Sequence, residues 1–215
     1  MSETLVVNEV YLSLQGESTF AGLPCVFVRL TACNLRCSYC DTAYAFYEGE
    51  DMSLEQVIQA VQKWDCSLVE ITGGEPLLQK EVYPLMDRLI ADGFLVLLET
   101  GGSIDIGKVP PKVIKIMDLK CPSSGESEKN RYDNISKLHT HDEIKFVIGN
   151  REDYLWTLDI IRKHHLDGKF RILFSTVFDA LSPSDLVEWI LEDKLNVRFQ
   201  LQMHKYIWNP EKRGV

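Results

Sequence analysis

Hydrophobic residues follow two different patterns along this chain. Short, nearly continuous apolar runs predict strands that are buried on both faces. Between them, apolar residues spaced by three and four positions predict amphipathic helices. Strands are predicted at residues 25–30, 68–72, 94–99, 113–119, 143–148, 170–174 and 197–202, and helices at 53–64, 79–92, 152–164 and 183–192.

The order of these elements predicts the fold class. Strand and helix alternate from about residue 25 to about residue 200, which is typical of parallel strands joined by right-handed crossovers. About six such units are too few to close the eight-unit barrel. We therefore expect an α/β fold, a partial parallel β/α barrel of about six units, in a single domain spanning 1–215; a doubly wound open sheet is the alternative. Residues 122–134 are polar and predict a surface loop. In either architecture, ligands bind beyond the carboxyl ends of the strands.

Composition narrows the possible partners. The 215 residues include 23 Lys and Arg against 32 Asp and Glu, a net charge of −9 that disfavours a broad nucleic-acid groove. No apolar run reaches the roughly 18 residues that a membrane span needs. The first residues lack the basic and apolar pattern of a signal peptide, so we expect a cytoplasmic protein. Six cysteines without an export signal favour metal binding or chemistry over disulfides.

Three cysteines cluster just after the first predicted strand, as Cys33, Cys37 and Cys40 in a C-x3-C-x2-C pattern. A cubane iron–sulfur cluster usually has four cysteine ligands, so three would leave one iron open for chemistry. A structural zinc site, completed by a remote His or Cys, is the alternative. A second motif, Thr72 to Pro76 (TGGEP), follows another predicted strand, and its glycines permit close backbone approach.

The two motifs together resemble the signatures of the radical S-adenosylmethionine (SAM) superfamily. Within it, the chain resembles the 7-carboxy-7-deazaguanine synthase family over residues 8–215. Glycyl-radical-enzyme activating enzymes, which share both motifs, are an alternative, and a non-enzymatic zinc or iron–sulfur module is another. The segments that carry the family resemblance are 11–18 (YLSLQGES), 27–30 (FVRL), 40–42 (CDT) and 202–206 (QMHKY).

The resemblance implies a lyase of queuosine or 7-deazapurine biosynthesis. Its substrate would be 6-carboxy-5,6,7,8-tetrahydropterin, and its products 7-carboxy-7-deazaguanine and ammonia. A reduced 4Fe–4S cluster would cleave SAM to a 5′-deoxyadenosyl radical that removes a hydrogen, the ring would contract, and SAM would be regenerated. The implied cofactors are the cluster, SAM and Mg²⁺. The implied partners are the pterin, an electron donor such as flavodoxin or ferredoxin, and a second copy in a homodimer.

The resemblance also implies residue roles, none of them as a protein acid or base. Thr42 would bind Mg²⁺, because a hydroxyl, a substrate carboxylate and waters suit this hard ion. Arg29 would hold the substrate carboxylate with its planar fork. The cluster would be held by Cys33, Cys37 and Cys40; SAM would contact Tyr39, Cys40, Asp41, Gly74, Asp118 and Lys120; and the substrate would contact Leu14, Gln15, Gly16, Arg29, Thr72 and the Val215 carboxylate.

Overall fold

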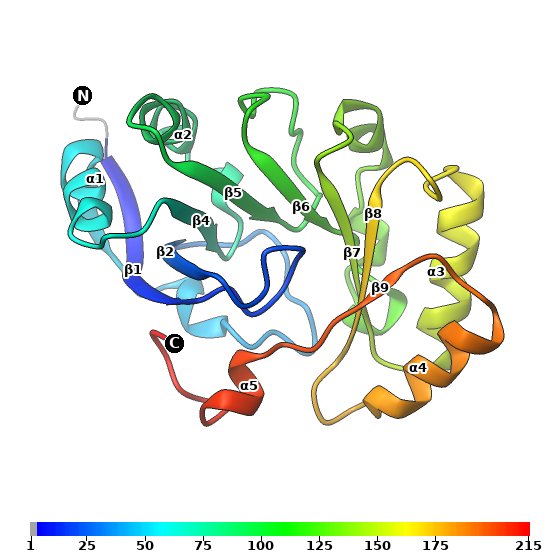
Figure 1. The fold of residues 1–215 in the computed structure, drawn as a ribbon. Coiled ribbons are helices and arrows are strands. Elements are labelled where there is room, and N and C mark those ends of the chain that lie inside the picture. Colours follow the sequence, from blue (N-terminus) through cyan, green and yellow to red (C-terminus); the bar gives the residue numbers. More distant parts are fainter. Residues whose placement is uncertain (1–3) are drawn as a thin grey trace.

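The computed structural model describes residues 4–215, and one nine-stranded sheet runs through them (Figure 1). Its order is β3-β1-β2-β4-β5-β6-β7-β8-β9, and every neighbouring pair from β2 to β9 is parallel. Strands β3 and β9 are its two edges, so the sheet is unclosed, as expected. The strands are β1 (Thr4–Leu14), β2 (Pro24–Leu30), β3 (Glu50–Ser53), β4 (Leu68–Gly73), β5 (Leu95–Thr100), β6 (Ile114–Asp118), β7 (Glu143–Ile148), β8 (Arg171–Thr176) and β9 (Arg198–Phe199).

The four longer helices cover the outer face of the curved sheet (Figure 1). The four predicted helices are present, and their starts follow from local chemistry. Ser53 and Gln56 form a capping box at the start of α1, and the Asn150 side chain accepts a hydrogen bond from Asp153 N at the start of α3. In the part of the chain described, no helix is long and apolar enough to cross a membrane. The helices are α1 (Leu54–Gln62), α2 (Val82–Ala91), α3 (Arg151–Lys163), α4 (Pro183–Glu192) and a short α5 (His204–Ile207).

Two crossovers differ from the predicted alternation of strand and helix. The described residues between β5 and β6 contain no helix, and those between β6 and β7 form three short 3-10 helices at 122–124, 127–129 and 132–137. The prediction of a surface loop at 122–134 is therefore wrong in part. Asn134 is fully buried, and its amide donates to Gly102 O (3.1 Å) and Ile104 O (2.7 Å). A buried amide that satisfies loop backbone makes a polar segment part of the fold.

Further elements extend the sheet beyond the predicted strands. Strand β1 runs antiparallel to both β2 and β3, so the sheet begins with an antiparallel part. Strand β9 is shorter than predicted, with only residues 198–199 paired to β8. The chain after it crosses back toward the first strands and ends near them (Figure 1).

The inner face of the sheet changes character along its strands. An apolar cluster that includes Phe27, Leu97, Ile116 and Leu173 covers the part of this face that lies farther from the carboxyl ends of the strands. Because side chains alternate along a strand, positions two residues further on point to the same face. On three strands those positions carry charge, as Arg29 on β2, Glu99 on β5 and Asp118 on β6, and Lys145 on β7 is in register with Asp118. We therefore expect the functional site at the carboxyl ends of the strands, next to this apolar cluster.

A buried ion pair on the opposite side of the sheet should stabilise the fold. Lys115 Nζ lies 3.0 Å from Asp142 Oδ2, and the two side chains are 2% and 0% exposed. We expect Lys115→Met to lower the free energy of unfolding by about 3–5 kcal/mol, because it leaves Asp142 buried without its countercharge. Urea denaturation measures this. The matched control, Lys112→Met at an exposed site, should change it by about 0.5 kcal/mol or less. Equal effects of the two changes would contradict the prediction.

Candidate functional site

The cysteine loop begins where β2 ends. Ala32, with a φ of 78°, turns the chain away from the strand, and its N–H donates to Ala45 O (2.9 Å). Cys33, Cys37 and Cys40 follow, all partly exposed. The pKa of the Cys37 thiol is raised to about 11, chiefly by burial; Lys120 opposes the rise, and Asp118 and the other two thiols add to it. The three thiols thus lie close enough to influence one another.

The TGGEP segment lies directly against this loop. Gly74 N donates to Leu30 O (3.2 Å), and Glu75 N donates to Ala32 O (2.8 Å). A Cβ on Gly74 would lie 2.2 Å from Ala32 O and 2.8 Å from Cys33 Cβ, so only glycine fits. The structure therefore brings the two motifs of the sequence together at the carboxyl ends of β2 and β4.

Glu75 ties this segment to the next strand. It is fully buried and accepts hydrogen bonds from Thr100 Oγ1 (2.9 Å) and Gly101 N (2.8 Å). Burial raises the pKa of its carboxyl group, and these donors oppose that rise. A Cβ on Gly101 would lie 3.0 Å from Leu35 Cδ1, so β5 also supports the cysteine loop. Sequence reasoning missed Thr100 and Gly101, although a Thr-Gly-Gly triplet at the end of a buried strand is a signal for such a turn.

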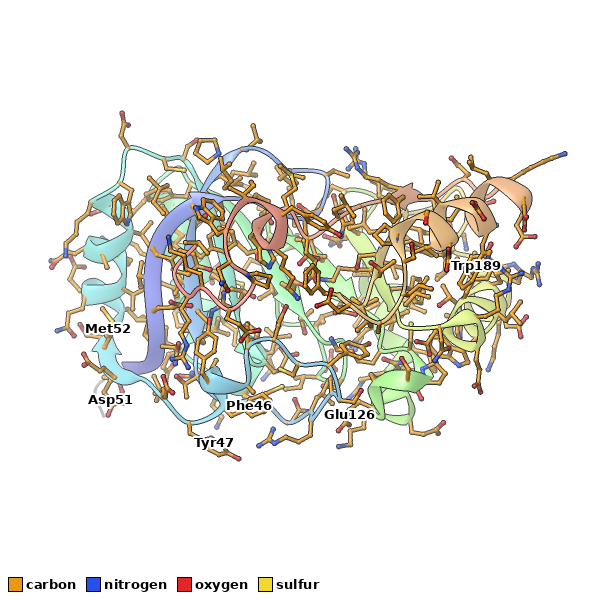
Figure 2. The ribbon with its side chains drawn as sticks, turned by 90° about the horizontal axis from the view of Figure 1, so that it is seen from below. Phe46, Tyr47, Asp51, Met52, Glu126 and Trp189 are labelled. Carbon is orange, nitrogen blue, oxygen red and sulfur yellow. The ribbon has the colours of Figure 1, made fainter. Side chains whose placement is uncertain are left out.

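Arg36 attaches the outer side of the cysteine loop to neighbouring segments. Arg36 N donates to Glu126 Oε1 (2.8 Å), and the Arg36 guanidinium lies 4.3 Å from the centre of the Phe46 ring. Figure 2 shows Phe46 and Glu126 on the same side of the molecule. The crossover between β6 and β7, which contains residues 122–137, thus contacts the cysteine loop from outside.

The donor set fits an iron–sulfur cluster. Three thiols come from one loop that lies against the Gly74 backbone, and the nearby Lys120 ammonium group lowers the pKa of the Cys37 thiol against the effect of burial. Three thiolates leave one iron of a cubane open. Within residues 4–215, no three His, Cys, Asp or Glu side chains are arranged to hold a single metal ion. Thr42 Oγ1 lies 3.8 Å from Cys40 Sγ.

Asp118 and Lys120, the residues expected to contact SAM, form an ion pair beside the loop. Lys120 Nζ lies 2.7 Å from Asp118 Oδ2. Burial disfavours the ammonium form of Lys120, but Asp118 and Cys37 together outweigh it, so the pKa of Lys120 lies above its usual value. Asp118 Oδ1 is buried and has no hydrogen-bond partner among the described residues. A buried acceptor without a partner suits a ligand that brings a donor.

The other residues expected at SAM make protein contacts. Tyr39 OH donates to Val147 O (3.3 Å), which joins the cysteine loop to the end of β7. Asp41 Oδ2 lies 2.8 Å from Lys205 Nζ. Burial would raise the pKa of Asp41, but the attraction of Lys205 outweighs it, so the pKa lies below its usual value. Asp41 thus anchors the C-terminal segment, a role that the sequence did not indicate.

The C-terminal segment also closes over the residues expected at the substrate. Met203 N donates to Gly16 O (3.1 Å), and a Cβ on Gly16 would lie 2.9 Å from His204 Nδ1. The buried Gln15 donates from Nε2 to Glu70 Oε2. The segment 14–16 therefore lies between the sheet and the tail.

Arg29 is oriented by its neighbours. Its side chain is 12% exposed, Nε lies 2.7 Å from Glu9 Oε1, and Nη2 donates to Tyr11 OH (2.8 Å). Arg29 is in register with Thr72 on β4, so the two expected substrate contacts are neighbours. A Cβ on Gly214 would lie 3.8 Å from Glu9 Oε2, which places the end of the chain beside the same carboxylate. Sequence reasoning missed Glu9, because the strand that carries it was not predicted.

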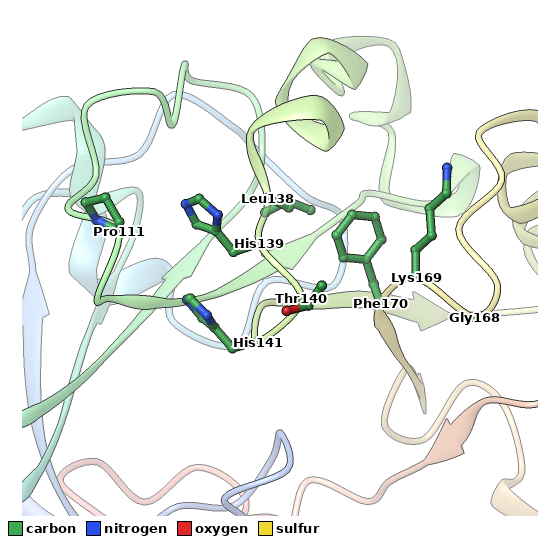
Figure 3. Close-up of a pocket in the computed structure, with 8 residues that line it drawn as sticks. All are labelled: Pro111, Leu138, His139, Thr140, His141, Gly168, Lys169 and Phe170. Atoms are coloured by element: carbon green, nitrogen blue, oxygen red, sulfur yellow. The ribbon is translucent and has the colours of Figure 1, made fainter.

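The structure has a separate pocket at the other end of the sheet. It measures about 700 Å³ and is lined by residues that precede β6, β7 and β8, with His139, His141 and Phe170 among them (Figure 3). The rings of His139 and His141 stack with centres 5.5 Å apart. No residue expected at the cofactor or the substrate lines this pocket.

Comparison with known proteins gives a family for this arrangement. Residues 28–191 match the radical SAM superfamily. The chain is 50% identical to a 7-carboxy-7-deazaguanine synthase from Koribacter versatilis, over 97% of this chain and 99% of that protein. It is 46% identical to one from Chlorobaculum tepidum, over 98% and 97% of the two chains. The crystal structure of QueE from Escherichia coli has a TM-score of 0.79 at 24% identity, over 94% of this chain and 95% of that one, and shares the fold. The chain therefore belongs to the 7-carboxy-7-deazaguanine synthase family of the radical SAM superfamily.

Proposed function

We propose that this protein converts 6-carboxy-5,6,7,8-tetrahydropterin to 7-carboxy-7-deazaguanine and ammonia by radical ring contraction. The observation that carries the proposal is the 50% identity, over 97% of this chain, to a protein named as that synthase. The site supports it, because loops at the carboxyl ends of parallel strands bring a three-thiol loop together with polar groups suited to a small ligand. The enzyme would work as a single domain.

One side of the site would hold the cofactors. Cys33, Cys37 and Cys40 would hold a 4Fe–4S cluster, and the cluster with SAM supplies the one-electron chemistry that removes a hydrogen atom from the substrate. The Gly74 backbone, which lies beside Cys33, would contact the methionine part of SAM. Asp118 Oδ1, buried without a partner among residues 4–215, would accept a hydrogen bond from SAM. Tyr39, Cys40, Asp41 and Lys120 complete the proposed SAM contacts.

The other side would hold the pterin. Arg29, fixed by Glu9 and Tyr11, would present its remaining N–H groups to the substrate carboxylate. Thr42 would help to hold Mg²⁺ together with the substrate carboxylate and waters. The remaining proposed substrate contacts are Leu14, Gln15, Gly16, Thr72 and the Val215 carboxylate.

Two partners complete the proposal. An electron donor such as flavodoxin or ferredoxin would approach the exposed part of the cysteine loop at Asn34 and Arg36. A homodimer would cover the apolar side chains Leu12 and Leu23, which are 39% and 51% exposed on the β1–β2 hairpin.

The proposal is tested by anaerobic incubation of the reconstituted enzyme with the carboxytetrahydropterin, SAM, Mg²⁺ and dithionite. Deazaguanine absorbance and one ammonia per product are expected, with SAM recovered. Formation of 5′-deoxyadenosine without deazaguanine would contradict the proposed substrate while leaving the superfamily chemistry intact.

Removing one thiol should abolish cluster binding. Cys37→Ala leaves two cysteines in the loop, too few to hold a cubane. Iron content and 5′-deoxyadenosine formation should both fall to background, measured after anaerobic reconstitution. The matched control is Cys66→Ala, a half-buried cysteine outside the loop, which should keep its iron and lose roughly 1 kcal/mol of stability at most. Full iron content in Cys37→Ala would refute this assignment of the ligands.

Removing the Thr42 hydroxyl should weaken the response to magnesium. Thr42→Ala deletes one proposed ligand, so the Mg²⁺ concentration for half-maximal activity should rise about tenfold. The affinity for SAM should stay within about twofold, because the hydroxyl faces the substrate carboxylate in the proposed arrangement. Thr140→Ala, in the loop at the other end of the sheet, is the control. An unchanged magnesium response would remove Thr42 from the site.

Replacing the guanidinium of Arg29 should raise the substrate KM. Arg29→Lys keeps the charge but loses the planar fork that bridges Glu9, Tyr11 and the proposed carboxylate. We expect KM for the pterin to rise about tenfold, the effect of about 1.4 kcal/mol of lost binding. Iron content should remain normal. Loss of iron with an unchanged KM would place Arg29 at the cluster instead.

A further inference from the structure

A buried lysine of β7 lies at the centre of the charged layer on the inner face of the sheet. Lys145 is 5% exposed, and its register on the sheet pairs it with Asp118 of β6. Its ammonium group contacts carboxylates from three separate segments. Glu17 Oε2 lies 2.8 Å away, Glu99 Oε1 is in direct contact, and Asp118 Oδ2 lies 3.9 Å away.

Two of the three carboxylates lead to different parts of the site. Glu17 follows the 14–16 segment directly, and its carboxylate accepts hydrogen bonds from Gln202 (3.1 Å) and Gln200 (3.4 Å) of the C-terminal segment. Asp118 pairs with Lys120 at the proposed SAM position. Lys145 therefore stands between the elements proposed to hold the pterin and those proposed to hold SAM.

Lys145 compensates the negative charge of the buried carboxylates around it. Burial would raise the pKa of Glu17, but the attraction of Lys145 outweighs it and keeps that pKa below its usual value. Burial disfavours the ammonium form of Lys145 as well, yet Glu17, Glu99 and Asp118 raise its pKa well above the ordinary value. Lys145 is thus a fixed cation and a poor proton donor. Without it, carboxylates from three segments would repel one another in a buried space.

We propose that Lys145 is a positioning residue that sets the pterin-binding segment and the SAM-binding segment at their working separation. This inference rests on the proposed function. Hydrogen transfer between two bound molecules depends on their distance, and a misplacement of about 1 Å can cost on the order of 100-fold in rate. A loss of position would therefore separate radical formation from product formation.

The test compares Lys145→Met with Lys145→Arg and with Lys169→Met, the same change at an exposed site. In Lys145→Met we expect normal iron, kcat for deazaguanine lowered on the order of 100-fold, and more 5′-deoxyadenosine released per product. The dissociation constant of 6-carboxypterin, titrated calorimetrically without reductant, should rise about tenfold. Lys145→Arg should recover part of each loss, because it restores the charge. Lys169→Met should match the wild type.

A second variant covers the case in which Lys145→Met does not fold. The double change Lys145→Met with Glu99→Gln removes one cation and one carboxylate together, so it should fold and still release excess 5′-deoxyadenosine. A lower melting temperature alone, with the wild-type ratio and the wild-type pterin affinity, would show a merely structural lysine and overturn the proposal. Wild-type enzyme that makes no deazaguanine at all would instead contradict the proposed function.

Discussion

The close approach of the Gly73-Gly74 backbone to the end of β2 is the constraint on which the site depends. Any side chain at Gly74 would strike Ala32 O, and any at Gly73, whose φ is 143°, would strike Leu30 O at 2.1 Å. That contact fixes the cysteine loop against β4. Glu75 then carries the constraint to β5 through Thr100 and Gly101, so three consecutive strands of the sheet share one support for the loop.

On the inner face of the sheet, apolar side chains pack together along part of the strands, and charged side chains follow nearer the carboxyl ends. Its apolar cluster needs no ligand to be stable, whereas the layer above it concentrates carboxylates and lysines that compensate one another. A layer of this kind is costly to bury unless its charges are paired. The protein places it where ligands can complete the pairing, which explains why an acceptor such as Asp118 Oδ1 has no partner among the described residues.

The parallel strands and the two motifs of the site could be predicted from the sequence, because both depend on local residue patterns. Buried parallel strands read as apolar runs, and the cysteine and TGGEP motifs each lie within a few residues of a strand end. The strand that carries Glu9 could not be predicted in the same way, because its side chains are mostly half-buried and give no clear alternation. Contacts between remote segments, such as Glu9 with Arg29, Asp41 with Lys205 and Lys145 with Glu17, depend on the folded topology. For that reason, the sequence supported Arg29 as a ligand contact without revealing what holds it.

The docking of the C-terminal segment has a consequence for the order of assembly. Met203 N donates a hydrogen bond to Gly16 O. The wall of the site formed by the 14–16 segment and the C-terminal segment therefore joins residues from nearly opposite ends of the described chain. Contacts so distant in sequence form late, after the loop between them has closed. On the ribosome, the sheet and the cysteine loop can therefore be in place while that wall is still missing. The 14–16 segment and Asp41 therefore gain their contacts with Met203 and Lys205 only after those last residues have been made, so the substrate side of the site is completed after the cysteine loop.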